Sequence, residues 1–283
     1  MKKLYRCIIS LLLFCSFGFG QDVLDLFPEK PGSLVCWTET RTAPRPLKIY
    51  YLKAALNASG LEAFALPGND PDGPGPAESQ LTPPITLFKK FHALAAVNAN
   101  AFAGLPGDTA SSQNWFEGRA VDIHGMVVSG SKVISPLENG RTPFWLDALQ
   151  KPHIGTPPST DIVAEAVADW FSPLLADTRI IPEPADYVLH PRTAVGFDDT
   201  GTWLLLIVVD GRQPGFSEGV SLYELAQIMQ AQGCTQAINL DGGGSSIMLI
   251  QEPDKDARTV NSPSGKTHRP VPVMLGIRKS PHP

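Results

Sequence analysis

The stretch AINLDGGGSSIML, residues 237–249, places one carboxylate and three consecutive glycines between two apolar runs. Consecutive glycines cost backbone entropy, and they are typical of positive φ angles or of a backbone that closely approaches a ligand. Successive exposed N–H groups in such a turn form a concave nest for an anion, and Ser245 and Ser246 add two hydroxyl donors. The stretch predicts a carboxylate, Asp241, beside an anion site, with a glycine-rich hairpin turn as the structural alternative.

A strand and a helix are predicted immediately before this stretch. Residues 203–209 (WLLLIVV) form a fully apolar run of strand length. Ser221 and Glu224 have the spacing of a capping box, an apolar stripe of helical period follows, and Gly233 is a typical helix stop. Residues 237–240 then predict a second strand. The order strand, helix, strand indicates a βαβ-like unit, with a right-handed crossover if the two strands are parallel.

Parallel strands of one unit end at the same edge of a sheet. The first strand is followed by Asp210 and Arg212, and the second by Asp241. We therefore expect these three side chains to lie close together at that edge.

Short apolar runs predict further strands at residues 47–55, 61–66, 93–97 and 144–149, and a hairpin over 122–135 with Ser129 and Gly130 as its turn. Thr86 is expected to cap a short helix ending at Phe91. A longer helix is predicted to begin at Ser159 or Thr160, because apolar residues of IVAEAVADWF fall at helical spacing. Together with the high proline content, these elements indicate a compact, loop-rich globular protein.

The N-terminal segment has the features of an export signal. Residues 1–20 contain Lys2, Lys3 and Arg6, then an apolar run, then small residues, which predicts a signal peptide. We expect an extended lead-in at 21–46 and one catalytic domain at 47–283. The protein is expected to be periplasmic or secreted, without stable membrane insertion after signal cleavage.

Cysteine content and charge limit the class of protein further. Outside the signal only Cys36 and Cys234 remain, and export permits either a disulfide between them or two buried thiols. The formal net charge is −5, and no basic stripe is present, which argues against a nucleic-acid partner. The oligomeric state is left open by the sequence.

Several familiar chemistries are excluded by the motif itself. GGGSS lacks the lysine of a nucleotide-binding P-loop, and neither serine lies in the GxSxG of an α/β-hydrolase. The six histidines are scattered, and His124, alone on its strand, is interpreted as structural. No metal and no cofactor are predicted. Glycosyl or phosphoryl chemistry on an anionic substrate remains.

Several segments together resemble the phosphodiester glycosidase family. They are AAVNANAF (95–102), RTAVG (192–196), LLLIVVDGR (204–212), the GVSLYELAQIM helix, AINLDGGGSS (237–246) and VNSPSGKTHRP (260–270). The resemblance extends over roughly residues 47–277 and is closest from Arg192 onward. It implies an α+β fold, with mixed β-sheets packed around a few helices and the βαβ-like unit carrying the active-site loops. It implies an exported hydrolase of a sugar-1-phosphodiester similar to an N-acetylglucosamine-1-phosphodiester, free or within a polysaccharide or phosphoglycan. The expected partner is such a diester or another anionic glycan.

This chemistry suits the candidate residues. Cleavage of the sugar C1–O bond releases a phosphate monoester whose second pKa is about 6, so the leaving group departs as a stable anion. Less general-acid assistance is needed than for an ordinary glycoside. Asp241 is the candidate nucleophile or general base, and Asp210 is either a second carboxylate or a support for Arg212. The candidate substrate-binding residues are Asn98, Asn100, Arg192, Thr193, Arg212, Asn239, Gly242, Gly243, Gly244, Ser245, Ser246, Asn261 and Arg269.

Two other functions fit the same residues. A non-catalytic carbohydrate- or phosphate-binding protein would keep the anion site without turnover. A phosphodiesterase would cleave the P–O bond instead of the C–O bond.

Overall fold

A computed structural model describes residues 22–56, 60–108, 114–169, 173–185, 187–265 and 267–281. The largest sheet has eight strands in the order β1-β2-β3-β17-β16-β18-β14-β15. Their bounds are β1 Leu24–Asp25, β2 Leu34–Arg41, β3 Leu47–Ala55, β17 Trp203–Val209, β16 Arg192–Phe197, β18 Gln236–Asn239, β14 Pro173–Ala176 and β15 Arg179–Ile180.

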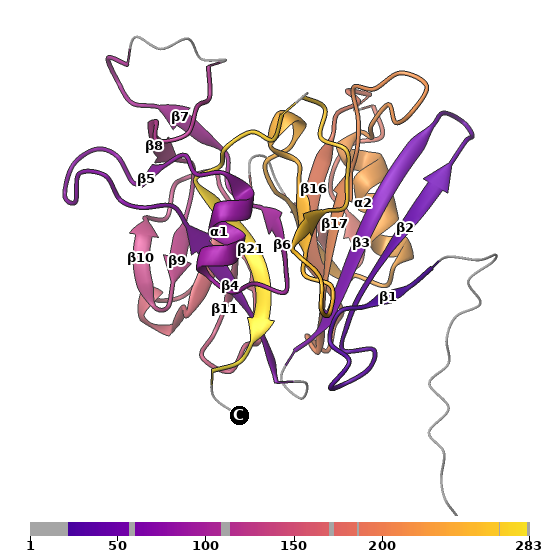
Figure 1. The fold of residues 1–283 in the computed structure, drawn as a ribbon, viewed down its shortest axis with the longest axis horizontal. Helices are drawn as coiled ribbons and strands as arrows, with labels where there is room; N and C mark the ends of the chain where they lie inside the picture. Colours follow the sequence, from indigo (N-terminus) through magenta and orange to yellow (C-terminus); the bar gives the residue numbers. More distant parts are fainter. Residues whose placement is uncertain are drawn as a thin grey trace, which may run out of the picture.

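Three smaller sheets complete the fold (Figure 1). One contains β10 Lys132–Ser135, β9 Val127–Ser129, β13 Glu165–Ala168, β11 Pro143–Leu146 and β12 Pro152–Ile154. A second contains β20 Arg258–Thr259, β19 Met248–Ile250, β6 Ala95–Asn98, β21 Val273–Lys279 and β4 Leu61–Pro67. The third contains β5 Ser79–Gln80, β8 Ala120–Ile123 and β7 Phe102–Gly104.

The α+β class predicted from the sequence is wrong, because the fold is mainly β. The described residues form 21 strands and only two α-helices, α1 Pro84–Lys90 and α2 Leu222–Ala231, with 3₁₀ turns η1 Thr160–Ile162 and η2 Gly243–Ser245. The strands of the described ladders pair antiparallel, as in β16 with β17 and β6 with β21. The sheets pack chiefly on one another, and each helix covers one outer face.

The central core lies between the sheets. Strand β17 explains why residues 203–209 are apolar at every position: Leu206 faces the central core with Phe144 of β11 and Leu275 of β21. Its neighbour Ile207 faces a second core with Met229 of α2. Because side chains alternate along a strand, a strand covered on both faces needs apolar residues throughout. In Figure 1, α2 lies against the eight-stranded sheet and α1 against the sheet of β21 and β4.

The βαβ-like unit is present in a split form. Strand β16 lies between β17 and β18 and is antiparallel to both, so β17 and β18 run parallel to each other. They end at one edge of the sheet, where β16 begins. The inference that the strands before Asp210 and Asp241 end at the same edge of the sheet is therefore correct, although β16 lies between them.

Several local predictions are confirmed. Strands β3, β4, β6, β11, β17 and β18 occupy the predicted segments to within a few residues. Ser221 Oγ accepts from Glu224 N at 3.1 Å, and Glu224 Oε2 accepts from Ser221 N at 2.9 Å, which completes the capping box of α2. Gly233 has φ +89°, the left-handed conformation typical of a helix stop.

The helix predicted after Ser159 is wrong. Only η1 is helical, and residues 165–168 form β13, which pairs with β11 and β9. The apolar residues of this segment fit the alternation of a strand as well as the spacing of a helix. Tertiary contacts decide which of the two structures forms. Glu165 accepts from Ala65 N at 2.9 Å and Gly130 N at 2.8 Å, bonds that a helix there would forfeit. Residues 170–172 lie outside the described residues.

Two turn assignments shift. Helix α1 begins at Pro84 after Pro83 and has no side-chain cap, so Thr86 lies inside its first turn. The hairpin β9–β10 pairs Lys132 with Ser129, so its two-residue turn is Gly130-Ser131, one residue later than predicted. Strand β8 belongs to another sheet.

The N-terminal predictions are tested only in part. The predicted signal at 1–20 lies outside the described residues. The predicted lead-in at 21–46 contains β1 and β2, and β2 pairs with β3 along its whole length. Cys36 and Cys234 are buried free thiols, one in the central core and one in the core under α2, and burial raises the pKa of both to about 12.

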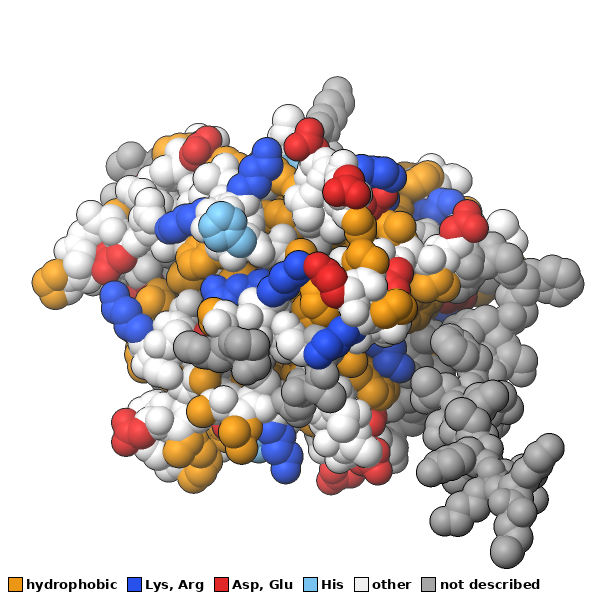
Figure 2. Space-filling view, turned by 60° about the horizontal axis from the view of Figure 1, so that its bottom comes forward, with side chains coloured by type: hydrophobic (Ala, Val, Ile, Leu, Met, Phe, Trp, Pro, Cys, Tyr) orange, Lys and Arg blue, Asp and Glu red, His pale blue; other side chains and the backbone are white. Residues whose placement is uncertain are grey.

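The surface is mixed in charge on the face drawn in Figure 2. Acidic and basic side chains are scattered there among apolar and uncharged ones. Within the described part of the chain, neither helix has the length and apolar character needed to cross a membrane.

The cap of α2 gives a test of the fold. We expect Ser221→Ala to lower the free energy of unfolding by about 1 kcal/mol, because it removes the hydroxyl that accepts from Glu224 N. Urea denaturation measures this change. Ser221→Thr keeps a capping hydroxyl and should lose only a few tenths of a kcal/mol, so equal losses in the two variants would contradict this role of the cap.

Candidate active site

Three chain segments meet at one end of the central core. The loop after β18 begins with Asp241, the loop after β17 begins with Asp210, and β6 ends at Asn98. These strand ends lie toward the top of the view in Figure 1. Asp241 N donates to Ala99 O at 2.8 Å, which joins the loop after β18 directly to the end of β6.

Asn98 holds both ends of the glycine-rich loop. Its side-chain amide donates to Asp241 O at 2.6 Å, and its Oδ1 accepts from Ile247 N at 3.1 Å. The same oxygen accepts from Thr193 Oγ1 at 2.8 Å. Asn98 and Thr193 are buried, so both act as supports of the loop.

The loop itself forms η2. Gly242 N donates to Asp241 Oδ1 at 2.9 Å, and Gly243 N donates to Pro191 O at 2.9 Å. Two of the three glycine amides predicted to bind an anion are therefore engaged within the protein. Gly243 has φ +60°, which an L-residue rarely adopts.

The glycines also leave room for two arginines. A Cβ on Gly243 would lie 3.1 Å from Nη1 of Arg212, and one on Gly244 would lie 2.5 Å from Nη2 of Arg269. Arg269 Nη1 donates to Ser245 Oγ at 3.4 Å. The lack of side chains thus lets two guanidinium groups lie against the loop.

Both guanidinium groups keep their charge available. Among the described residues, the ion pairs within 4 Å do not include Arg212 or Arg269. Nη2 of Arg212 lies 3.4 Å from Nδ1 of His190, a residue that sequence reasoning missed although it directly precedes Pro191 and Arg192. A positive pair beside one carboxylate suits an anion such as phosphate.

Asp241 is the carboxylate at the centre of this arrangement. Burial raises its pKa to about 6, while the hydroxyl of Ser245 and the charges of Arg269 and Arg212 oppose the rise. A partly buried carboxylate with a pKa near neutrality suits acid–base or nucleophilic work.

Asp210 is placed differently. It is only 1 % exposed, and its two oxygens accept from Asn261 Nδ2 and Ser262 N, both at 2.9 Å. Burial raises the pKa of Asp210. The hydrogen bonds from Asn261 and Ser262, and a further one from Tyr50, oppose the rise. Asn261 in turn accepts from Met248 N at 2.8 Å and donates to Ser246 O at 3.1 Å. The geometry makes Asp210 and Asn261 a brace behind the loop.

Arg192 and Asn239 lie on the other face of the sheet. Ala194, two residues after Arg192, belongs to the core under α2, and Arg192 donates to Val220 O and Val188 O at 3.3 Å. Asn239 pairs with Ala194 and is fully buried. The structure therefore does not bring these two side chains to the loop.

Ser246 is also buried, and its Oγ has no hydrogen-bond partner among the described residues.

Asn100 turns away from Asp241. Its side chain donates to the carbonyls of His124, Gly125 and Met126 at 3.0–3.4 Å. Of the two candidate asparagines, Asn98 therefore contacts the loop. In the described ranges no group of three or more histidine, cysteine or acidic side chains is arranged around a common point.

The family profile of phosphodiester glycosidases matches residues 92–278. The chain therefore belongs to the phosphodiester glycosidase family, and the resemblance inferred from the sequence is confirmed. The fold agrees: the zebrafish N-acetylglucosamine-1-phosphodiester alpha-N-acetylglucosaminidase catalytic domain, auto-inhibited by its pro-peptide, superposes with a TM-score of 0.62 at 19 % identity. That match covers 91 % of this chain and 87 % of the zebrafish chain.

Curated relatives share a shorter region. An uncharacterised SPbeta prophage-derived protein of Bacillus subtilis is 46 % identical over 90 residues, which is 32 % of this chain and 13 % of that protein. The bovine N-acetylglucosamine-1-phosphodiester alpha-N-acetylglucosaminidase is 43 % identical over 63 residues, 22 % of this chain and 11 % of the enzyme. The matches thus span little more than a tenth of the curated relatives' length.

The contact between Gly243 and Arg212 can be tested by ligand binding. We expect Gly243→Ala to weaken the binding of inorganic phosphate about tenfold, because displacing one charge-assisted contact costs about 1.4 kcal/mol or more. Calorimetric titration measures the affinity. Gly215→Ala is the matched control, since Gly215 also has a positive φ (+79°) but no atom within 4 Å of its added Cβ. Equal loss in both variants would assign the effect to backbone strain.

Proposed function

We propose that the protein hydrolyses a sugar-1-phosphodiester similar to an N-acetylglucosamine-1-phosphodiester, releasing free sugar and a phosphate monoester. The observation that carries this proposal is Asp241, a partly buried carboxylate between a glycine loop and two arginines without ion-pair partners among the described residues. The family membership and the names of the bovine and zebrafish relatives support the choice of substrate.

The roles follow from the charges. Arg212 and Arg269 bind the phosphate and stabilise the charge that develops on the leaving oxygen. The monoester leaves as an anion, so a strong general acid is not required. Asp241 acts on the anomeric carbon directly as nucleophile or through a water as general base. Asp210, Asn261, Thr193 and Asn98 hold the loop in place.

Export is part of the proposal. The basic, apolar and small-residue segments of residues 1–20 support a signal peptide and a periplasmic or secreted protein. A Burkholderia pseudomallei protein of similar fold, described as a putative exported protein, has a TM-score of 0.54 at 15 % identity. The substrate is then a diester met outside the cytoplasm, such as one within a polysaccharide or phosphoglycan.

Incubation with an N-acetylglucosamine-1-phosphodiester tests the reaction. We expect free sugar to appear, and Asp241→Asn to slow its release by at least about 100-fold because the carboxylate acts on the reacting centre. Asp199→Asn, an exposed aspartate far along the chain from the loop, is the control. Binding without release would favour a non-catalytic binding protein.

The bond cleaved is determined in the same assay with ¹⁸O-labelled water. Label in the sugar means C–O cleavage, as proposed. Label in the phosphate would mean a phosphodiesterase that cleaves P–O.

The pH dependence follows from Asp241. Its pKa is raised to about 6, so the ionised form that attack requires is lost as the pH falls through 6. We expect kcat/KM to decline below about pH 6, whereas an unperturbed aspartate would keep activity down to about pH 4. Arg269 lowers this pKa, so Arg269→Gln should move the decline to higher pH. A decline at the same pH in both proteins would mean that another group titrates.

A further inference from the structure

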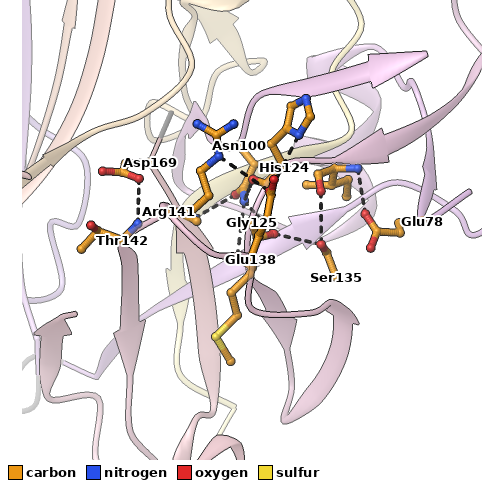
Figure 3. Close-up of polar contacts among 12 residues, drawn as sticks. Glu78, Asn100, His124, Gly125, Ser135, Glu138, Arg141, Thr142 and Asp169 are labelled. Atoms are coloured by element: carbon orange, nitrogen blue, oxygen red, sulfur yellow. Dashed lines mark hydrogen bonds and ion pairs between the residues drawn. The ribbon is translucent and has the colours of Figure 1, made fainter. Parts of the chain in front are cut away.

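A second polar cluster begins two residues beyond Asn98, after the end of β6, and has no role in the proposed reaction. It consists of Asn100, His124, Glu138, Arg141 and Asp169, hereafter the Asn100 cluster (Figure 3). The five residues come from the ends of β6, β8 and β13 and from the loop between β10 and β11. From the sequence, His124 is interpreted as a structural histidine alone on its strand, and its ring lies near Glu138 of the loop between β10 and β11.

Glu138 connects the two basic members of the Asn100 cluster. Its Oε2 lies 3.8 Å from Nδ1 of His124 and 3.6 Å from Nε of Arg141. Side-chain exposure is 21 % for His124, 18 % for Arg141 and 43 % for Glu138. The three groups therefore position one another while part of each faces solvent.

Asp169 carries a buried oxygen without a donor. The residue is 0 % exposed, and its Oδ1 accepts from Thr142 N at 2.8 Å, whereas Oδ2 has no hydrogen-bond partner within the described residues. Burial raises its pKa to about 6, and Arg141 opposes the rise. A buried acceptor without a donor is costly, and a buried water supplies such a donor at a fully enclosed site.

Three consecutive residues join the Asn100 cluster to Asp241. Asn98 donates to Asp241 O, Ala99 accepts from Asp241 N, and Asn100 accepts from Ala168 N at 3.1 Å, next to Asp169. The backbone of Asp241 is thus bonded to residues 98 and 99, directly before Asn100, while its carboxylate accepts from Gly242 N of the glycine loop. The chain segment that joins the glycine loop to the Asn100 cluster is therefore short, as a ligand with phosphate at one end and sugar at the other requires.

The glycine loop and the Asn100 cluster differ in charge. At the glycine loop, Arg212 and Arg269 exceed the single carboxylate of Asp241, which suits an anion. In the Asn100 cluster, the carboxyl groups of Glu138 and Asp169 lie with the guanidinium of Arg141, the amide of Asn100 and the imidazole of His124, so the group offers donors and acceptors without an excess of arginine. Such a group suits the hydroxyl and amide groups of an uncharged sugar.

We propose that the Asn100 cluster binds the sugar unit of the substrate, with Glu138 and Arg141 as its principal contacts. This inference rests on the proposed function, because it takes the sugar to be the part of the diester that remains after the phosphate is bound at the glycine loop. Asn100 positions the His124 segment and the end of β13.

The test compares two ligands on two sets of variants. Calorimetry or ligand-observed NMR measures the binding of free N-acetylglucosamine and of inorganic phosphate to the whole protein. We expect Glu138→Gln and Arg141→Lys each to weaken sugar binding about tenfold, the effect of losing one charge-assisted contact, and to change phosphate binding less than about twofold. Arg212→Lys should show the reverse pattern.

Glu62→Gln is the control, because Glu62 also pairs with an arginine, Arg278 at 2.6 Å, but does so between strands β4 and β21. It should leave both affinities unchanged. Thermal melting shows whether each variant folds. Because Glu138 is half-exposed, Glu138→Gln is the milder substitution and still tests the proposal if Arg141→Lys does not fold. Equal loss of both ligands, or no loss of sugar binding, would overturn the proposal.

The measurement does not depend on turnover. If the wild-type protein binds the sugar and Glu138→Gln weakens that binding without hydrolysis being detected, the subsite stands and the proposed reaction fails. If hydrolysis occurs but Glu138→Gln leaves sugar binding and KM unchanged, the reaction stands and the subsite is wrong.

Discussion

The hydrogen bonds of the Asn98 side chain are the interaction on which the rest of the site depends. One buried amide donates to Asp241 O and accepts from Ile247 N and Thr193 Oγ1, so it joins β6 to β16 and to both ends of the glycine loop. Inside a protein such a network is strengthened by the low dielectric, and each partner left unpaired costs about 1–3 kcal/mol. The loop therefore keeps its position independently of Arg212 and Arg269, which are left to act on a ligand.

The local sequence pattern predicted individual strands and helices better than it predicted how they assemble into sheets. Residues 203–209 are apolar throughout because both faces of β17 are covered, and the capping box of α2 is formed wholly by neighbours in sequence. Glu165 illustrates the limit, because its partners at Ala65 and Gly130 are distant in the chain and convert a helical pattern into β13. The fold class was predicted wrongly for the same reason. The periodicity of apolar residues indicates a strand, but it does not indicate which sheet the strand joins.

The site was predicted where it is continuous in sequence and missed where it is not. Asp241 and the glycines follow one strand, and the shared edge of β17 and β18 brings Arg212 to them. Arg192 was assigned to the same group, but alternation along β16 turns it toward α2. The Asn100 cluster draws its five residues from four segments, none with a motif of its own. Only tertiary packing brings them together.

The two cysteines have a practical consequence. Cys36 and Cys234 belong to different cores on opposite faces of the eight-stranded sheet, so oxidation cannot join them without dismantling it. The described fold has no disulfide bond to form, so its folding does not depend on redox conditions. Because burial also keeps both thiols protonated, the domain should be recoverable from a reducing cytoplasm and resist thiol reagents until it unfolds. Alkylation can then report on unfolding of the two cores.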